Sequence, residues 1–169
     1  EPKPYLSLQS MFDPFVPHGW HRYWKSVELP RLTDDAIDTL VEQASAQTSP
    51  KSYCIVFQLG GMLSRVGRDE TAFTQRDAAY NVNINAVWTP EDPDAERHIQ
   101  WARDYFAAMQ PHARDRVYLN FLGDEGPHRV RQAYGPATYD RLAELKATYD
   151  PDNFFRLNQN IHPSWVANR

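Results

Sequence analysis

Residues 80–88 read Tyr80-Asn81-Val82-Asn83-Ile84-Asn85-Ala86-Val87-Trp88, and amide and apolar side chains alternate along them. Because side chains of a β-strand point alternately to opposite faces, this stretch predicts a strand with its three asparagines on one face and its apolar residues on the other. Asparagine is disfavoured in strands, so three on one face need an explanation. Two explanations stay open, a solvated face or a polar wall that faces a ligand.

Three other stretches have the pattern of helices. Thr33 can cap a helix over residues 34–46, and a second helix is predicted over residues 93–109. Pro136 suits the first turn of a third helix, which stops at residues 150–151. The side chains expected to point inward are Ile37, Leu40, Val41 and Ala44 in the first helix, Ile99, Ala102, Phe106 and Met109 in the second, and Tyr139, Leu142 and Leu145 in the third.

The remaining stretches predict more strands. Residues 1–30 are interpreted as an extended lead-in with strand-like pieces over residues 19–29. Residues 53–57 are β-branched and aromatic and predict a largely buried strand, and residues 117–122 predict a last strand. Strands and helices in this order indicate an α+β fold, in which an antiparallel β-sheet has helices packed on one face.

Length and composition exclude several classes of protein. The chain has 169 residues, 41% hydrophobic and 24% charged, so we expect a folded domain and not a disordered or fibrous chain. With 18 basic and 22 acidic residues the net charge is -4, which disfavours nucleic acid and anionic membranes as partners. The mean hydropathy is -0.68 and no long apolar run occurs, so we expect a soluble protein, either cytoplasmic or secreted.

Common catalytic and binding motifs are missing from the sequence. The 7 glycines against 13 prolines leave little of the backbone that cradles phosphates, and there is no P-loop, GxGxxG or Gly-x-Ser-x-Gly motif. The histidines form no HExxH motif, and His18 with His21 is a weak metal pair, so no metal site is predicted. Cys54, the single cysteine, lies in an apolar stretch, where an inert core thiol is expected.

Longer motifs occur in the last third of the chain: Tyr118-Leu119-Asn120-Phe121, Tyr134-Gly135, Tyr139-x-Arg141-Leu142, Lys146, and Tyr149-Asp150-Pro151-Asp152-Asn153-Phe154-Phe155-Arg156-Leu157-Asn158-Gln159-Asn160-Ile161. They resemble the C-terminal region of the berberine bridge enzyme-like FAD-linked oxidases of the vanillyl-alcohol oxidase superfamily. The substrate domain of that family is similar to several upstream stretches: Tyr23-Trp24-Lys25-Ser26, Gly60-Gly61, Thr71-Ala72-Phe73 with Arg76, and the strand that ends at Trp88. The resemblance therefore covers nearly the whole chain.

This resemblance implies a part of an FAD enzyme. Residues 1–125 resemble the C-terminal part of the substrate-binding domain, and residues 126–169 resemble the C-terminal segment that returns to the flavin. The N-terminal FAD-binding domain is not among these residues. The implied cofactor is FAD, and the implied partners are an FAD-binding half, as a separate chain or a cleaved portion, and a small-molecule substrate. The implied reaction is oxidation by hydride transfer to flavin N5, with reoxidation by dioxygen.

The same resemblance implies site residues, although the chain departs from the family at two places. The family's base is often the second tyrosine of a Tyr-x-Asn-Tyr motif, and here that position is Phe121. Other catalytic residues of the family, often Glu or Gln, lie on the strand before Trp88, where this chain has asparagines. Both departures remove a base. The expected catalytic positions are Asn83, Phe121, Tyr118 and Asn81, and the expected cofactor-binding residues are Asn158, Asn160, Tyr118 and Asn120.

Several interpretations of these departures stay open. The chain belongs to an active oxidase whose base comes from Tyr118, Tyr80 or the FAD-binding half, or it catalyses a step that needs only hydride transfer or flavin-oxygen chemistry. A third interpretation is a catalytically inactive module that binds a small molecule. For Asn158 and Asn160, turn capping is the alternative to contact with the isoalloxazine ring, and an extended segment would point both the same way.

Overall fold

The alternating stretch forms the central strand of the fold. The computed structural model describes residues 2–68, 70–114, 118–123 and 125–163. In it, β1 (His21–Leu29), β3 (Tyr80–Trp88) and β2 (Tyr53–Gln58) make a three-stranded antiparallel sheet in the order β1-β3-β2. The prediction of a strand over residues 80–88 is confirmed.

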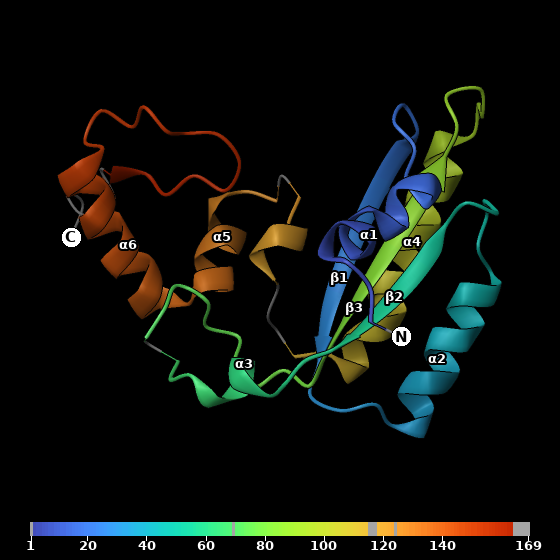
Figure 1. The fold of residues 1–169 in the computed structure, drawn as a ribbon, viewed down its shortest axis with the longest axis horizontal. Coiled ribbons are helices and arrows are strands. Elements are labelled where there is room, and N and C mark those ends of the chain that lie inside the picture. The colour runs from blue at the N-terminus through green and yellow to red at the C-terminus, as the bar shows by residue number, and fades with distance from the viewer. Residues whose placement is uncertain (1, 69, 115–117, 124, 164–169) are drawn as a thin grey trace.

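One face of this sheet is covered by helices (Figure 1). α4 (Ala95–Met109) packs on β1 and β3, and α2 (Asp34–Ser45) packs on α4. The side chain of Trp101 donates a hydrogen bond to the carbonyl of Gln43, and the hydroxyl of Tyr105 donates one to the carbonyl of Leu40, both at 2.9 Å. The expected α+β fold with helices on one face is therefore confirmed.

The core lies between α4 and the apolar face of the sheet. The apolar side chains that alternate with the asparagines of β3 point into it, as the period of two predicts. Its buried residues are Val27, Leu29, Val82, Ile84, Ala86, Trp88, Trp101, Ala102, Tyr105 and Met109.

A second, smaller core lies near the C-terminus, on the other side of the sheet from α2 in Figure 1. Here α5 (Pro127–Tyr134) and α6 (Pro136–Tyr149) pack together with η3 (Leu119–Phe121). The buried residues are Leu122, Val130, Ala133 and Tyr139, and Leu119, Tyr134 and Ile161 pack against them. The remaining elements are short: α1 (Tyr5–Gln9), η1 (Ser10–Phe15), α3 (Met62–Arg65) and η2 (Gln110–His112).

Two expectations about strands are wrong. Residues 119–121 form a 3₁₀-helix and not the end of a strand, while residue 117 lies outside the described residues. The chain turns there because Leu119 and Leu122 both pack into the second core. β2 is an edge strand and not a largely buried one: among the strands of the described ranges it pairs only with β3, and Val56 and Phe57 are exposed.

Other local expectations are partly confirmed. The lead-in is helical over residues 5–15 instead of extended, and α5 was not predicted. The Thr33 cap is confirmed, because its hydroxyl accepts a hydrogen bond from the backbone N–H of Ala36 at 3.2 Å. The expected stripe of α4 packs on the core, and α6 stops at Asp150, although Leu145 is exposed.

In α2 the apolar stripe is rotated from the expected one. Ile37 and Val41 are 43% and 60% exposed. Leu40 and Ala44 pack on the core as expected, and Ala36 is the buried residue that was not expected. The prediction of a helix was therefore right, but the prediction that Ile37 and Val41 face the core was wrong.

Candidate functional site

The sheet face opposite α4 carries buried polar side chains. The register places Glu28 of β1 and Phe57 of β2 on either side of Asn81, so the three residues form one row across the sheet. In the next row Ser26 lies beside Asn83. Glu28, Asn81 and Asn83 are only 2%, 3% and 6% exposed. The solvated-face explanation is therefore wrong for Asn81 and Asn83.

The two buried asparagines have hydrogen-bonding groups to spare. Asn81 donates from Nδ2 to the hydroxyl of Ser26 at 2.9 Å, and Asn83 accepts at Oδ1 from Nδ2 of Asn85 at 2.6 Å. Oδ1 of Asn81 and Nδ2 of Asn83 are buried and have no hydrogen-bond partner in the described part of the chain. Since buried polar atoms are nearly always paired in folded proteins, these two groups are candidates for ligand contacts.

A cavity of about 250 Å³ opens over the Asn81 row. Its aromatic wall is connected: Phe121 stacks on Phe57 with ring centroids 6.1 Å apart, and the edge of Tyr118 meets Phe121 at 5.1 Å. The lining residues are Glu28, Phe57, Gln58, Leu59, Leu63, Phe73, Asn81, Tyr118 and Phe121. Flat apolar walls with a few polar groups on the floor suit a small, ring-bearing molecule.

The structure brings together three of the four expected catalytic positions. Asn81, Tyr118 and Phe121 line this cavity, whereas Asn83 lies on the same sheet face but is not among the lining residues. Tyr80 packs on the core from the other face of β3, so it cannot supply a base to the cavity. Glu28 was not predicted from the sequence, although its place between the apolar residues Val27 and Leu29 of β1 was a signal for it.

Two of the four expected cofactor-binding residues, Asn120 and Asn158, line a second cavity of about 570 Å³, whereas Tyr118 lines the first cavity. The lining residues of the second cavity are Trp24, Leu119, Asn120, Leu122, Tyr134, Leu157, Asn158 and Gln159. Asn120 also donates from Nδ2 to the hydroxyl of Tyr118 at 2.7 Å, which links the two cavities. Asn160 is not among the lining residues, and its Oδ1 is buried without a hydrogen-bond partner in the described part of the chain.

The tail is not extended at these asparagines. Asn158 has a φ of 59°, in the left-handed region, and the backbone N–H of Asn160 donates to the Asn158 carbonyl at 2.9 Å. This bend contradicts the expectation of an extended segment that points both side chains the same way. Upstream, Asp150 accepts the backbone N–H groups of Phe154 (2.7 Å) and Phe155 (3.1 Å), which fixes the turn after α6.

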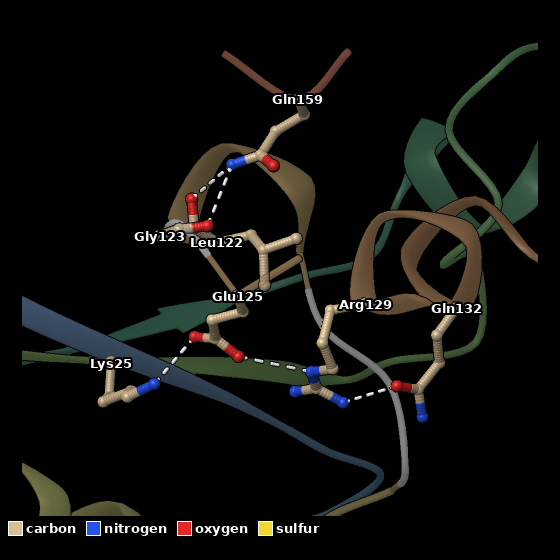
Figure 2. A network of polar contacts seen from close by, with 7 residues as sticks. All are labelled: Lys25, Leu122, Gly123, Glu125, Arg129, Gln132 and Gln159. Carbon is tan, nitrogen blue, oxygen red and sulfur yellow. Dashed lines mark hydrogen bonds and ion pairs between the residues drawn. The ribbon is translucent and has the colours of Figure 1, made fainter. Parts of the chain in front are cut away.

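A polar network joins the sheet to the second core (Figure 2). Glu125 accepts from Lys25 of β1 at 2.7 Å and from Arg129 of α5 at 3.3 Å, and Arg129 donates onward to Gln132 at 2.5 Å. Gln159 donates to the carbonyls of Leu122 (2.7 Å) and Gly123 (3.2 Å). The network thus positions the segment that contains Tyr118 and Phe121 against β1 and against the tail.

The stability of the chain should depend on the ionisation of Glu125. Burial raises the pKa of its carboxyl, but the hydrogen bond and charge of Lys25, followed by those of Arg129, outweigh burial and hold the pKa below its ordinary value. The folded state therefore binds this proton less tightly than the unfolded state. The stabilisation is fully present above the unfolded-state pKa of about 4.3 and is lost as the pH falls through the folded-state value.

We expect Glu125→Gln to lower the free energy of unfolding by about 1 kcal/mol at pH 7 and to have a smaller effect at acid pH, where the wild-type carboxyl is itself protonated. Urea unfolding at several pH values between 7 and 3 measures this. Glu96→Gln is the control, because Glu96 pairs with Arg103 at an exposed position. A Glu125→Gln effect that does not change with pH would contradict the assignment.

Other polar clusters hold the helices and lie away from the two cavities. His98 is buried between the Thr48 hydroxyl (2.7 Å) and the Asp92 carboxylate (3.0 Å). Burial raises the pKa of the Cys54 thiol, opposed by its hydrogen bond with Tyr105. Within the described ranges there is no group of three His, Cys, Asp or Glu side chains that could hold a metal ion, and no helix is long and apolar enough to cross a membrane.

The chain is similar in sequence to known proteins. The family model described as berberine and berberine like matches residues 117–162. An FAD-linked oxidoreductase of Dictyostelium discoideum is 30% identical over 162 residues, which cover 95% of this chain and 35% of the relative. Tetrahydroberberine oxidase of Berberis wilsoniae is 27% identical over 176 residues, which cover 93% and 33%.

The fold is also found in a solved structure. Berberine bridge enzyme from Eschscholzia californica superposes with a TM-score of 0.72 at 21% identity, over 84% of this chain and 33% of that one. The chain spans about a third of the length of the curated relatives it matches. It belongs to the berberine bridge enzyme-like FAD-linked oxidoreductases, and it fits the C-terminal part of these enzymes.

Proposed function

We propose that this chain is the substrate-binding and C-terminal part of an FAD-dependent oxidase, which oxidises a small organic substrate by hydride transfer to flavin N5 and is reoxidised by dioxygen. The observation that carries this proposal is the buried amide face of β3 under an aromatic cavity, in a chain of this family. The division of the chain at residue 125 into a substrate domain and a C-terminal segment stays a prediction.

The residues of this chain suit the ring end of FAD better than its phosphates. The sequence has no glycine-rich phosphate loop. The unpartnered amide atoms of Asn81, Asn83 and Asn160 can instead pair with the nitrogen and oxygen atoms of an isoalloxazine ring or of a substrate. We therefore assign the pyrophosphate to an FAD-binding portion outside these residues.

The two cavities have different roles in this proposal. The cavity at Asn81 binds the substrate: Phe57, Phe121 and Tyr118 pack on its apolar body, and Oδ1 of Asn81 accepts a hydrogen bond from it. The cavity at Asn120 and Asn158 faces the flavin, and Asn160 lies beside it in the same bent segment. Tyr118 contributes to both, since its hydroxyl accepts from Asn120.

An apolar surface next to the second cavity supports the need for an FAD-binding portion. Phe154, Phe155 and Leu157 are 79%, 77% and 86% exposed although they lie in one short segment. Exposed apolar groups of this kind, gathered in one place, mark surfaces that another part of a protein covers. We propose that the FAD-binding portion covers them.

Coexpression with an FAD-binding portion tests the proposed function. The chain and the FAD-binding part of a relative should copurify as a yellow complex in light scattering with absorbance detection, and a substrate should bleach the flavin under anaerobic conditions. A colourless chain that stays monomeric in the mixture would refute the proposal, and so would a monomer that binds FAD tightly by itself.

Ligand binding without catalysis is the second candidate function. It is favoured by Phe121, because phenylalanine stands where the family often has its catalytic tyrosine and cannot accept a proton. It predicts a yellow complex that binds small aromatic molecules but whose flavin no substrate reduces. Anaerobic reduction of the flavin therefore distinguishes the two functions.

A further inference from the structure

The outer edge of β2 is not paired with a strand in the described part of the chain, because β2 is the last strand in the order β1-β3-β2. In an antiparallel pair, every second residue exchanges both backbone hydrogen bonds with its partner. The backbone N–H of Leu59 donates to the Ala79 carbonyl at 2.8 Å, which sets the phase of this alternation. The residues whose backbone groups turn away from β3 are therefore Cys54, Val56 and Gln58.

The opposite edge of the sheet is partly covered, whereas β2 lacks the usual protection of a strand edge. The backbone N–H of Arg114 donates to the Glu28 carbonyl of β1 at 3.1 Å, and η3 packs near β1. Natural proteins protect open edges with charged residues or proline, because a bare edge pairs with other strands. β2 reads Tyr-Cys-Ile-Val-Phe-Gln, without charge or proline. Val56 and Phe57 are 42% and 40% exposed, so the edge is accessible to another strand.

Both faces of β2 offer contacts to an added strand. On one face Phe57 lines the substrate cavity. On the other face Val56 is in register with the core residue Val82 and is itself exposed. α2 flanks β2 on this side in Figure 1, and its exposed apolar side chains are Ile37 and Val41. A strand beside β2 would therefore extend the apolar helix side of the sheet and the wall of the cavity together.

We propose that the outer edge of β2 pairs with a β-strand of the FAD-binding portion, an inference that rests on the proposed function. The chain spans about a third of the length of its curated relatives, so these enzymes have the residues to supply such a strand. Neighbouring strands lie about 4.8 Å apart, and side chains alternate between the faces. One set of side chains of the added strand thus packs beside Val56 and α2, and the other beside Phe57 closes the substrate cavity.

A second copy of this chain fits the edge less well. α2 lies close to β2, since Leu40 and Ala44 of α2 and Cys54 of β2 pack against the same core. If two β2 strands paired edge to edge, the two α2 helices would meet on the same face of the joined sheet. α2 carries four exposed acidic side chains and no basic one: Asp34, Asp35, Asp38 and Glu42. Like charges repel, so this surface favours a partner with basic side chains beside its strand over a second α2.

Hydrogen exchange tests the pairing directly. The chain is labelled with ¹⁵N and compared alone and in the yellow complex with the FAD-binding part of a relative. In the chain alone, the amides of Cys54, Val56 and Gln58 should exchange at least about tenfold faster than those of Ile55 and Phe57, which face β3. In the complex this difference should disappear, because the outward amides then donate to the added strand.

Val56→Pro should block the pairing while the chain itself keeps its fold. Proline lacks the N–H that the added strand needs, yet it is tolerated in an edge strand where the N–H points outward. The affinity of the chain for the FAD-binding part, titrated by flavin absorbance, should fall by about ten- to a hundredfold. Val56→Ala is the matched control, because it removes the same side chain and keeps the N–H. It should weaken binding several-fold less than proline does, and urea unfolding of each variant alone checks the fold.

Each outcome decides the pairing. A yellow complex in which Cys54, Val56 and Gln58 still exchange faster than Ile55 and Phe57 overturns the pairing but leaves the proposed function standing, as does a Val56→Pro variant that binds like Val56→Ala. A chain that is a dimer by itself in light scattering, with the outward amides protected, identifies a second copy as the occupant and overturns the proposal. If Val56→Pro does not fold, the exchange comparison decides. If the wild-type chain and Val56→Ala both form no yellow complex, the proposed function fails and the pairing with it.

Discussion

Ile84→Ala should lower the free energy of unfolding by about 2–5 kcal/mol, the range for removing a large aliphatic side chain from a well-packed core. Ile84 is completely buried at the centre of β3, with Lys25 beside it on β1 and Cys54 beside it on β2. It belongs to the cluster that α4 covers. Since three strands and a helix meet there, the cavity left by alanine cannot close easily.

The control for this prediction is the same substitution at Ile37, in α2. Because Ile37 is 43% exposed, Ile37→Ala should change the free energy of unfolding by no more than about 0.5 kcal/mol, and alanine is the better helix former. Urea unfolding followed by circular dichroism measures both variants. If both substitutions lower the free energy of unfolding equally, the core does not lie between α4 and β3 as described.

Ile37 also shows what a local sequence pattern can and cannot predict. The sequence predicted the helix and its Thr33 cap, because spacing and capping depend on neighbouring residues. Which edge of the apolar stripe is buried depends on where α4 lies, and that is set by contacts such as Trp101 with Gln43, 58 residues apart. The prediction of a strand at residues 119–121 was wrong for a similar reason. Their side chains alternate as in a strand, but packing of this segment into the second core makes the chain turn.

The candidate site was predicted in the same partial way. Asn81, Tyr118 and Phe121 were named from the resemblance, and the structure brings them to one cavity. Glu28 was missed because it reaches the site through its register with Asn81, which is distant in the sequence. The bridge from Lys25 to Glu125 spans 100 residues and has no local signal at all.

Asn81→Leu should slow reduction of the flavin in the complex by about ten- to a hundredfold, because the substrate's donor would lose a buried acceptor, at a cost of about 1–3 kcal/mol. Oδ1 of Asn81 is buried at the cavity without a hydrogen-bond partner in the described ranges, so the fold itself does not use it. Folding loses only the hydrogen bond from Nδ2 to Ser26, and the free energy of unfolding should fall by about 0.5–1.5 kcal/mol.

Asn83→Leu is the matched comparison, since it makes the same change on the same strand and the same face. Asn83 is buried but does not line the substrate cavity, so its replacement should impair turnover more than folding and yet slow reduction less than Asn81→Leu does. Anaerobic stopped-flow reduction with benzyl alcohol, together with urea unfolding of each variant, gives the four numbers required. If Asn83→Leu slows flavin reduction more than Asn81→Leu does, the substrate binds farther along β3, toward Asn85. If neither variant changes the rate, the substrate does not bind on this face of the sheet.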